Sequence, residues 1–168
     1  MIELQKLRDI KKAEIIELMN HPKVRTHMPL AQGPFDDAAY NAFIAAKEAL
    51  WQKHGYGPWA FVCDGKFLGW GGLQYEEGDA DLALVLHPDH WGRGKEIYDL
   101  IINYDFNELR LSSITALLPP SRTRLKVMVR LGFIPDGEMT ISEKRFLRFR
   151  LNKKLVLANP RSGHNTEA

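Results

Sequence analysis

The fold is decided by the stretch Asp81-Leu82-Ala83-Leu84-Val85-Leu86-His87-Pro88-Asp89-His90-Trp91-Gly92-Arg93-Gly94-Lys95. Its apolar first half predicts a strand, and from Ile97 onward apolar residues recur at helical spacing. A strand, a basic glycine loop and a helix therefore follow one another. Such a junction points backbone N–H groups outward at the positive end of a helix, which suits a phosphate or pyrophosphate. An ordinary glycine turn with two solvated cations explains the loop equally well.

Two common nucleotide motifs are excluded at this loop. The Gly-Lys-Ser/Thr ending of a Walker loop is absent, and so is the six-residue dinucleotide fingerprint with three glycines.

The rest of the chain predicts the element order β-α-α-β-β-β-α-β-α-β-β and one domain. The expected elements are a strand from Ile2, a helix through Ala13 and Met19, a helix from the Asp36 N-cap to Gly55, strands at Trp59–Cys63 and Lys66–Leu73 around an Asp64-Gly65 turn, a strand at Ala80–Leu86, a helix through Ile97 and Tyr104, a strand at Ser113–Leu118, a helix at Ser121–Leu131, and a final β region from Phe133 to Leu151. We expect the domain to span residues 1–155 and the tail, residues 156–168, to be disordered.

Composition bounds the class of protein. The 168 residues are 45% hydrophobic and 26% charged, which excludes a disordered chain, a collagen-like fibre and a peptide toxin. The formal charge of +2 is too balanced to indicate a nucleic-acid binder. Cys63 is the single cysteine, so no internal disulfide can form, and a reducing setting is expected. The first residues lack a signal-peptide layout and no apolar run is long enough for a bilayer, so we expect a cytoplasmic protein.

The stretch from Asp81 to Lys95 resembles the strand and acyl-CoA loop of the GNAT superfamily of N-acetyltransferases. The Trp91-Gly92-Arg93-Gly94 run is similar to the branch that contains the ribosomal-protein alanine acetyltransferases. A second match is the helix from Ser121 with its closing Leu131-Gly132-Phe133. The expected element order also fits this family across roughly residues 1–155.

The resemblance implies an α/β protein with the acyl-CoA N-acyltransferase fold, in which a mostly antiparallel mixed sheet is splayed at the loop-bearing strand. Acetyl-CoA would lie in the opening, with main-chain groups of Val85 and Leu86 against its pantetheine arm and the amides of Gly92 to Glu96 around its pyrophosphate. The cofactor-binding residues expected are Val85, Leu86, Trp91, Gly92, Arg93, Gly94, Lys95, Glu96, Ser121, Arg122 and Arg124. Acetyl would pass directly to an amine, either a protein N-terminus or a small molecule.

Aminolysis of a thioester requires a neutral amine, and a carboxylate can accept the proton of the ammonium form. Asp81 matches the position where the resembling branch often carries Glu, so we predict it as the general base. A solvated Asp at the edge of an acidic linker is the alternative. The amide of Val85 or Leu86 could polarise the thioester carbonyl.

Three features depart from the family pattern. Glu96 stands where Gly or Ala is usual, and a carboxylate there would repel a phosphate unless it turns outward. In place of the usual Asn-x-x-Ser, Ser121 could replace the Asn and is a second catalytic candidate, and Arg124 stands where the Ser would. No tyrosine follows Tyr104, so the usual acid for the departing thiolate is missing, and water could fill that role.

The acceptor-binding residues predicted are His27, Tyr56 and Trp59, which fall in segments expected to border the acceptor pocket. We predict no metal. His87 and His90 are the closest histidine pair, but the intervening Pro-Asp disfavours joint ligation.

The near-neutral total conceals a division of charge. From Arg110 to Lys154 there are eleven basic and three acidic residues, which could attract the cofactor's phosphates. Arg122, Arg124 and Lys126 are candidates for its 3′-phosphate, whereas Arg148 and Arg150 are expected on the solvated face of a strand.

Three functions remain after these observations. An acetyl-CoA-dependent N-acetyltransferase, as a monomer or homodimer without membrane contact, is the first. A catalytically degenerate acyl-CoA-binding module is the second, favoured by Glu96 and the missing tyrosine. A nucleic-acid binder is weaker, because no array of stacking aromatics accompanies the basic residues.

Overall fold

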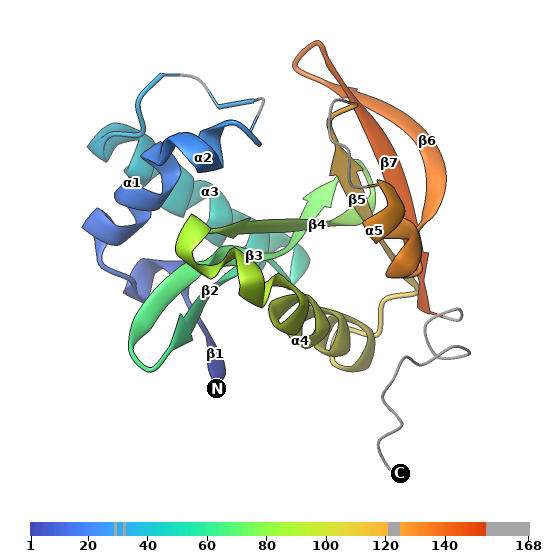
Figure 1. The fold of residues 1–168 in the computed structure, drawn as a ribbon, viewed down its shortest axis with the longest axis horizontal. Helices are drawn as coiled ribbons and strands as arrows, with labels where there is room; N and C mark the ends of the chain where they lie inside the picture. The colour runs from blue at the N-terminus through green and yellow to red at the C-terminus, as the bar shows by residue number, and fades with distance from the viewer. Residues whose placement is uncertain (29, 32, 121–124, 154–168) are drawn as a thin grey trace.

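The computed structural model describes residues 1–28, 30–31, 33–120 and 125–153, and its strands form one mixed sheet (Figure 1). The strands are β1 (Ile2–Gln5), β2 (Pro58–Cys63), β3 (Lys66–Glu76), β4 (Asp79–Leu86), β5 (Ser113–Leu118), β6 (Ile134–Ile141) and β7 (Lys144–Asn152). Their order in the sheet is β1-β2-β3-β4-β5-β7-β6. Every neighbouring pair is antiparallel except β4 and β5, which are parallel.

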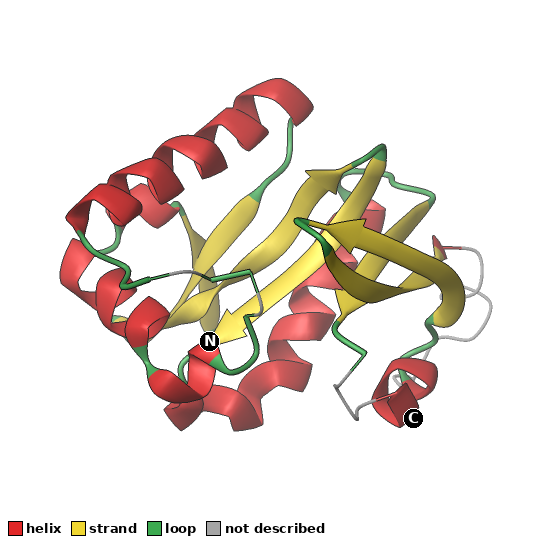
Figure 2. Cartoon of the chain, turned by 90° about the horizontal axis from the view of Figure 1, so that it is seen from above, coloured by secondary structure: helices red, strands yellow, loops and turns green. Residues whose placement is uncertain are grey.

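Helices cover both faces of this sheet (Figure 2). They are η1 (Leu7–Asp9), α1 (Lys12–Asn20), α2 (Pro22–Arg25), α3 (Asp37–His54), η2 (Pro88–Arg93), α4 (Gly94–Asn107) and α5 (Leu125–Arg130). The first three α-helices pack on one face, around Trp70. The fourth and fifth pack on the other, around Leu73, Ile114 and Leu151. The sheet is therefore the middle of three layers.

Local side-chain chemistry sets the boundaries that the sequence predicted. The Asp36 side chain accepts a hydrogen bond of 2.9 Å from the Ala39 amide at the start of α3. Gly55 ends that helix at φ +79°. Asp64 and Gly65, both at positive φ, form the tight turn between β2 and β3.

The expected element order is confirmed, with short additions. The helix α2 and the two 3-10 helices were not predicted, because segments of one or two turns carry too little periodicity. The described part of α5 begins at Leu125, and the residues predicted to start this helix, 121–124, lie outside the described residues. The tail predicted to be disordered lies outside them as well.

The sheet is splayed between β4 and β5, as predicted. Only Asp81 and Thr115 are paired across these two strands, whereas β4 continues to Leu86. Figure 1 shows β5, β6 and β7 turning away from the first four strands at this junction. The outer half of β4 therefore has a strand partner on one side only.

The side chains of β4 alternate between the two helical layers. Directly opposite residues of an antiparallel pair share a face, and β3 places Gln74 opposite Asp81 and Trp70 opposite Val85. Asp81 and Val85 therefore face the layer of α1 to α3. Leu86 faces α4, where it packs with Ile97 and Ile101.

Candidate active site

The open edge of β4 is the side that faces away from β3. It is formed by the peptide groups of β4 that do not bond to β3. The His87 amide donates to the Leu68 carbonyl at 2.9 Å. Hydrogen-bonded and non-hydrogen-bonded pairs alternate along an antiparallel ladder, so Val85 bonds to β3, whereas Leu84 and Leu86 direct their peptide groups to the opposite side. The Leu86 carbonyl indeed accepts the Trp91 indole N–H there, at 2.9 Å.

This alternation changes one detail of the sequence prediction. Val85 was expected to pair with the cofactor arm, but its peptide groups are used by β3. Leu84 takes its place on the open edge, and Leu86 stays there with its carbonyl already engaged. The sequence alone could not set this parity, because it depends on the register between β3 and β4.

The glycine loop leads directly into α4, as predicted. Gly94 is the first residue of this 14-residue helix, and the N-cap residue, Arg93, makes no side-chain capping bond. A Cβ at Gly92 would meet no atom within 4 Å, so the protein's own packing does not require glycine there. The Gly94 amide already donates to the Trp91 carbonyl, and the rest of the helix start together with the space at Gly92 fits a phosphate group.

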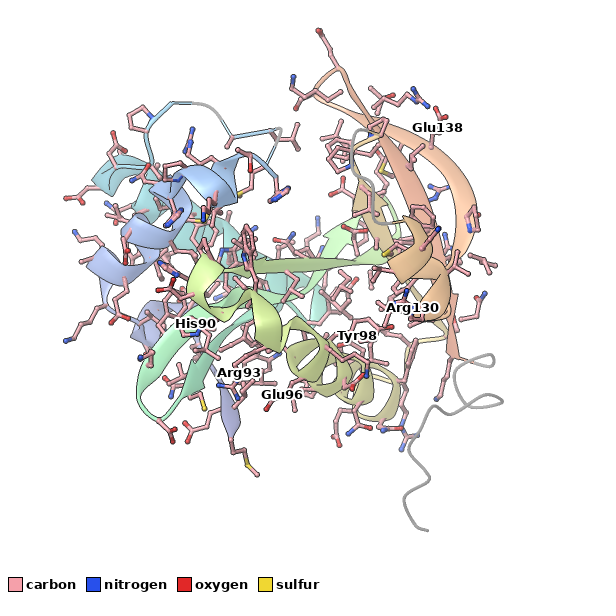
Figure 3. The ribbon with its side chains drawn as sticks, in the orientation of Figure 1. His90, Arg93, Glu96, Tyr98, Arg130 and Glu138 are labelled. Carbon is pink, nitrogen blue, oxygen red and sulfur yellow. The ribbon has the colours of Figure 1, made fainter. Side chains whose placement is uncertain are left out.

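The charged residues of the loop are paired along the helix (Figure 3). Arg93 donates to both carboxylate oxygens of Glu96, with a shortest distance of 3.0 Å. Lys95 pairs with Asp99 at 2.6 Å. Glu96 thus lies outward on the helix surface, with 53% of its side chain exposed. This is the orientation that the sequence required if the helix start is to receive a phosphate.

A cavity of about 230 Å³ lies beside the open edge of β4. Its walls come from the α2 segment, the strand and the glycine loop, namely Val24, His27, Met28, Leu84, Val85, Leu86, Trp91 and Gly94. The His27 and Trp91 rings meet edge to face, with centroids 5.9 Å apart. His27, which was predicted to bind the acceptor, therefore lies at the end of the site nearest the glycine loop.

Asp81 lies at the base of the split between β4 and β5. Asp81 is 9% exposed, and its Oδ1 accepts a 2.8 Å hydrogen bond from the Thr115 hydroxyl. Burial raises the pKa of Asp81 to about 7; the Thr115 hydrogen bond opposes this shift, and the carboxylates of Glu76 and Asp79 add to it. A carboxyl with a pKa near neutrality can take up and release a proton at physiological pH.

Two residues escaped the sequence prediction, namely Thr115, which contacts Asp81, and Lys47, which contacts the neighbouring strand β3. Thr115 is polar in an otherwise apolar strand, a signal that could have marked it. Lys47 lies among aromatic side chains on the face of α3 that packs against the sheet, where a lysine is unexpected. Its ammonium lies 5.2 Å and 5.0 Å from the ring centres of Phe43 and Trp70. It also donates to Gln74, the residue opposite Asp81, and burial lowers the pKa of Lys47 to about 8.

Arg148 and Arg150 correct an expectation, because they are not simply the solvated face of a strand. Arg150 donates to Asp79 on β4 at 3.0 Å, to Asp136 at 2.8 Å and to Ser113 on β5 at 2.9 Å. Arg148 pairs with the same Asp136 at 3.2 Å. About a quarter of each arginine side chain is exposed. These ion pairs join the β6–β7 hairpin to the base of the split.

The other predicted residues do not gather at the site. Trp59 packs between Trp51 and Tyr104, with ring centres 4.7 Å and 5.7 Å away. Tyr56 packs against the core on the α4 side of the sheet. Its pKa is raised, mainly by burial and then by the nearby Tyr75 and Asp79. Ser121, Arg122 and Arg124 lie outside the described residues.

The described part of the chain contains no group of three His, Cys, Asp or Glu side chains arranged to hold a metal ion. None of its helices is long and apolar enough to cross a bilayer.

Comparison with known proteins gives the family. The model of the acetyltransferase (GNAT) domain matches residues 2–134. An uncharacterized N-acetyltransferase p20 of Bacillus licheniformis is 32% identical over 75 residues, a match that spans 43% of this chain and 42% of that relative.

Solved structures share the fold. An acetyltransferase of Agrobacterium tumefaciens superposes with a TM-score of 0.72 at 21% identity, over 90% of this chain and 91% of that one. The N-acetyltransferase PseH of Campylobacter jejuni, solved in complex with acetyl coenzyme A, gives 0.65 at 19% identity, over 91% and 99%. The chain therefore belongs to the GNAT acetyltransferase family, whose members are acyltransferases that use acetyl-CoA.

Proposed function

We propose that residues 1–155 form an N-acetyltransferase domain that passes the acetyl group of acetyl-CoA directly to a primary amine, with Asp81 as the general base. The observation that carries this proposal is the position of Asp81. It is a buried carboxyl with a pKa near 7, on the same strand whose outer half is open to a ligand.

The open edge and the glycine loop provide the cofactor site in this proposal. N–H groups at the start of α4, between Gly92 and Glu96, bind the pyrophosphate, and the Leu84 peptide groups and the Leu86 N–H bind the arm as a further strand would. Acetyl-CoA supplies an acyl carbon that is activated as a thioester. The Leu84 N–H is placed to donate to the acyl oxygen as negative charge develops on it.

Asp81 accepts a proton from the acceptor amine. Its ionised form takes a proton from the ammonium group, directly or through one water, and leaves a neutral amine. The amine nitrogen then bonds to the acyl carbon as the carbon–sulfur bond breaks. One of the two protons then left on the nitrogen passes to the departing thiolate through water, because the described part of α5 carries no tyrosine, and the other stays in the amide product.

The test compares Asp81→Asn with a control variant, Glu143→Gln, whose carboxylate is exposed in the β6–β7 turn. Asp81→Asn should lower kcat/KM for an accepted amine by roughly 10² to 10³. Acetyl-CoA should still raise the thermal midpoint of the variant as it raises that of the wild type.

The same experiment distinguishes an N-acetyltransferase from an acyl-CoA-binding module that has lost turnover. Cofactor stabilisation without thiol release for any amine in a broad panel would make the chain an acyl-CoA-binding module. Equal activity of Asp81→Asn and Glu143→Gln would remove Asp81 from the role of base.

A further inference from the structure

A second cavity, of about 360 Å³, lies between the segment after α1 and the start of β7. Met19, Met28, Phe35, Ala39 and Phe146 form its apolar walls. Phe146 is 6% exposed, so its ring is part of the protein interior at this point. A cavity with such walls stabilises an apolar group that leaves water.

Among the described residues that line this cavity, one side chain is charged, and it is a cation. Arg25 is the only charged side chain among the described lining residues, and it donates to the Gly33 carbonyl at 2.6 Å and to the Met19 carbonyl at 3.4 Å. A second ammonium group placed here would meet a fixed positive charge and no carboxylate. The cavity therefore disfavours a polycation.

The strand register places this cavity relative to Asp81. Arg150 is opposite Thr115 and Arg148 is opposite Leu117, so Phe146 lies one further step along the same face. Each step of two residues covers about 6.6 Å. Measured along the strand direction, Phe146 is thus about two steps, or 13 Å, from Asp81 and Thr115. Ala83 and Leu117 lie one step along, midway between them. Met28 borders both this cavity and the one beside the open edge of β4.

Resting on the acetyl-transfer function proposed above, we propose that this cavity binds the apolar group of the acceptor. The acceptor is a primary amine that carries an aromatic or branched aliphatic group about two carbons from its nitrogen, and no second cation. Its nitrogen lies at the level of Ala83 and Leu117, one water-bridged step from Asp81, while its apolar group reaches Phe146. A small aralkylamine and a peptide N-terminus with a large apolar first residue share this chemistry.

The experiment measures kcat/KM for phenethylamine, for a dipeptide amide beginning with Phe, and for spermidine, by release of the CoA thiol. The wild type should prefer an apolar amine to spermidine by at least about tenfold. The better of the two apolar substrates identifies the source of the acceptor. Preference for spermidine, or equal use of all three, would overturn the proposal.

A matched pair of variants locates the specificity. Ala39→Asp introduces a carboxylate at the cavity wall, in the first turn of α3, where a negative charge is tolerated. Ala38→Asp places the same charge on the exposed side of that turn. Ala39→Asp should reduce the preference for the apolar amine about tenfold or more relative to Ala38→Asp. Equal shifts in the two variants would contradict the assignment.

Binding separates this proposal from the function on which it rests. Calorimetry should show phenethylamine binding to the wild type in the presence of CoA and weaker binding to Ala39→Asp. If no amine is acetylated but this difference is seen, the cavity assignment holds and the catalytic proposal fails. If phenethylamine is acetylated no better than spermidine, the cavity assignment fails and the catalytic proposal holds.

Discussion

The Asp81 carboxyl is subject to two opposing influences. Burial raises its pKa to about 7, and the hydrogen bond from Thr115 opposes the shift because it favours the ionised form. The ionised fraction therefore increases as pH rises through neutrality. If Asp81 is the base, the rate of acetyl transfer must increase over the same interval.

Thr115→Val tests the hydrogen bond while nearly preserving the volume of the side chain. Loss of the hydroxyl should raise the pKa of Asp81 further, so the midpoint of the pH profile of kcat/KM should move upward. Activity at pH 7 should fall, and activity at pH 9 should approach that of the wild type. Thr115→Ser keeps the hydroxyl and should keep the midpoint, and a downward shift in Thr115→Val would contradict the interpretation.

At the scale of elements, two glycines differ in whether packing within the protein requires them. Gly92 has no neighbour at its absent Cβ, whereas a Cβ at Gly71 would lie 2.5 Å from the Ala83 carbonyl oxygen. The first glycine leaves space outside the protein, and the second permits the close approach of β3 and β4.

Gly92→Ala should therefore leave the free energy of unfolding within about 0.5 kcal/mol of the wild type or raise it slightly. Its affinity for acetyl-CoA should fall severalfold, as measured by calorimetry. Gly71→Ala should instead destabilise the fold. An unchanged acetyl-CoA affinity in a folded Gly92→Ala variant would contradict the assignment of the loop.

Glu96→Gln removes a negative charge beside the proposed pyrophosphate site and releases Arg93. Acetyl-CoA should bind about three- to tenfold more tightly, and the helix should lose about 0.3–1 kcal/mol of favourable interaction with its dipole. Glu108→Gln, at the other end of α4, serves as the control for net charge. Weaker cofactor binding in Glu96→Gln alone would show that the carboxylate supports the site.

Elements with their own local signals were predictable from the sequence. Asp36, Gly55 and the Asp64-Gly65 turn act on their immediate neighbours, so their effect could be read without a fold. The use of Leu84 rather than Val85 at the open edge depends on register, and the partners of Arg150 come from three other strands. Long-range pairing of this kind leaves no periodic signal in the chain.

At the scale of the whole molecule, the sheet separates the layer of α1 to α3, where we propose that the acceptor binds, from the layer of α4 and α5. Asp81 was proposed as the base from the family resemblance at the start of the loop-bearing strand, whereas its burial and its contact with Thr115 could not be predicted from the sequence. Nor could the cavity at Phe146, because α1, α3 and β7 meet there only in the folded chain. The packing of Trp59 between Trp51 of α3 and Tyr104 of α4 could not be predicted for the same reason.

Stability should depend on pH through Asp105 in α4. This residue is 2% exposed; among the buried side-chain polar atoms of the described chain, its Oδ2 alone lacks a hydrogen-bond partner. Burial raises the pKa of Asp105 to about 8, above the usual value of 3.8. The protonated form therefore favours the folded state, and this contribution is complete below about pH 4 and lost as pH rises through 8.

Asp105→Asn should flatten that dependence. The difference in the free energy of unfolding between pH 5 and pH 8.5, measured by urea denaturation, should shrink by about 1 kcal/mol or more. An equal difference in both proteins would show that Asp105 does not titrate in this range.

The pH dependence of acetyl transfer tests the central claim most directly. The measurement is kcat/KM for an accepted primary amine from pH 5.5 to pH 9, in the wild type and in Asp81→Asn, with thiol release as the readout. We predict a wild-type profile that rises with a midpoint near pH 7, and a variant about 10²-fold slower that lacks this midpoint. The same midpoint and a similar rate in both proteins would contradict the account.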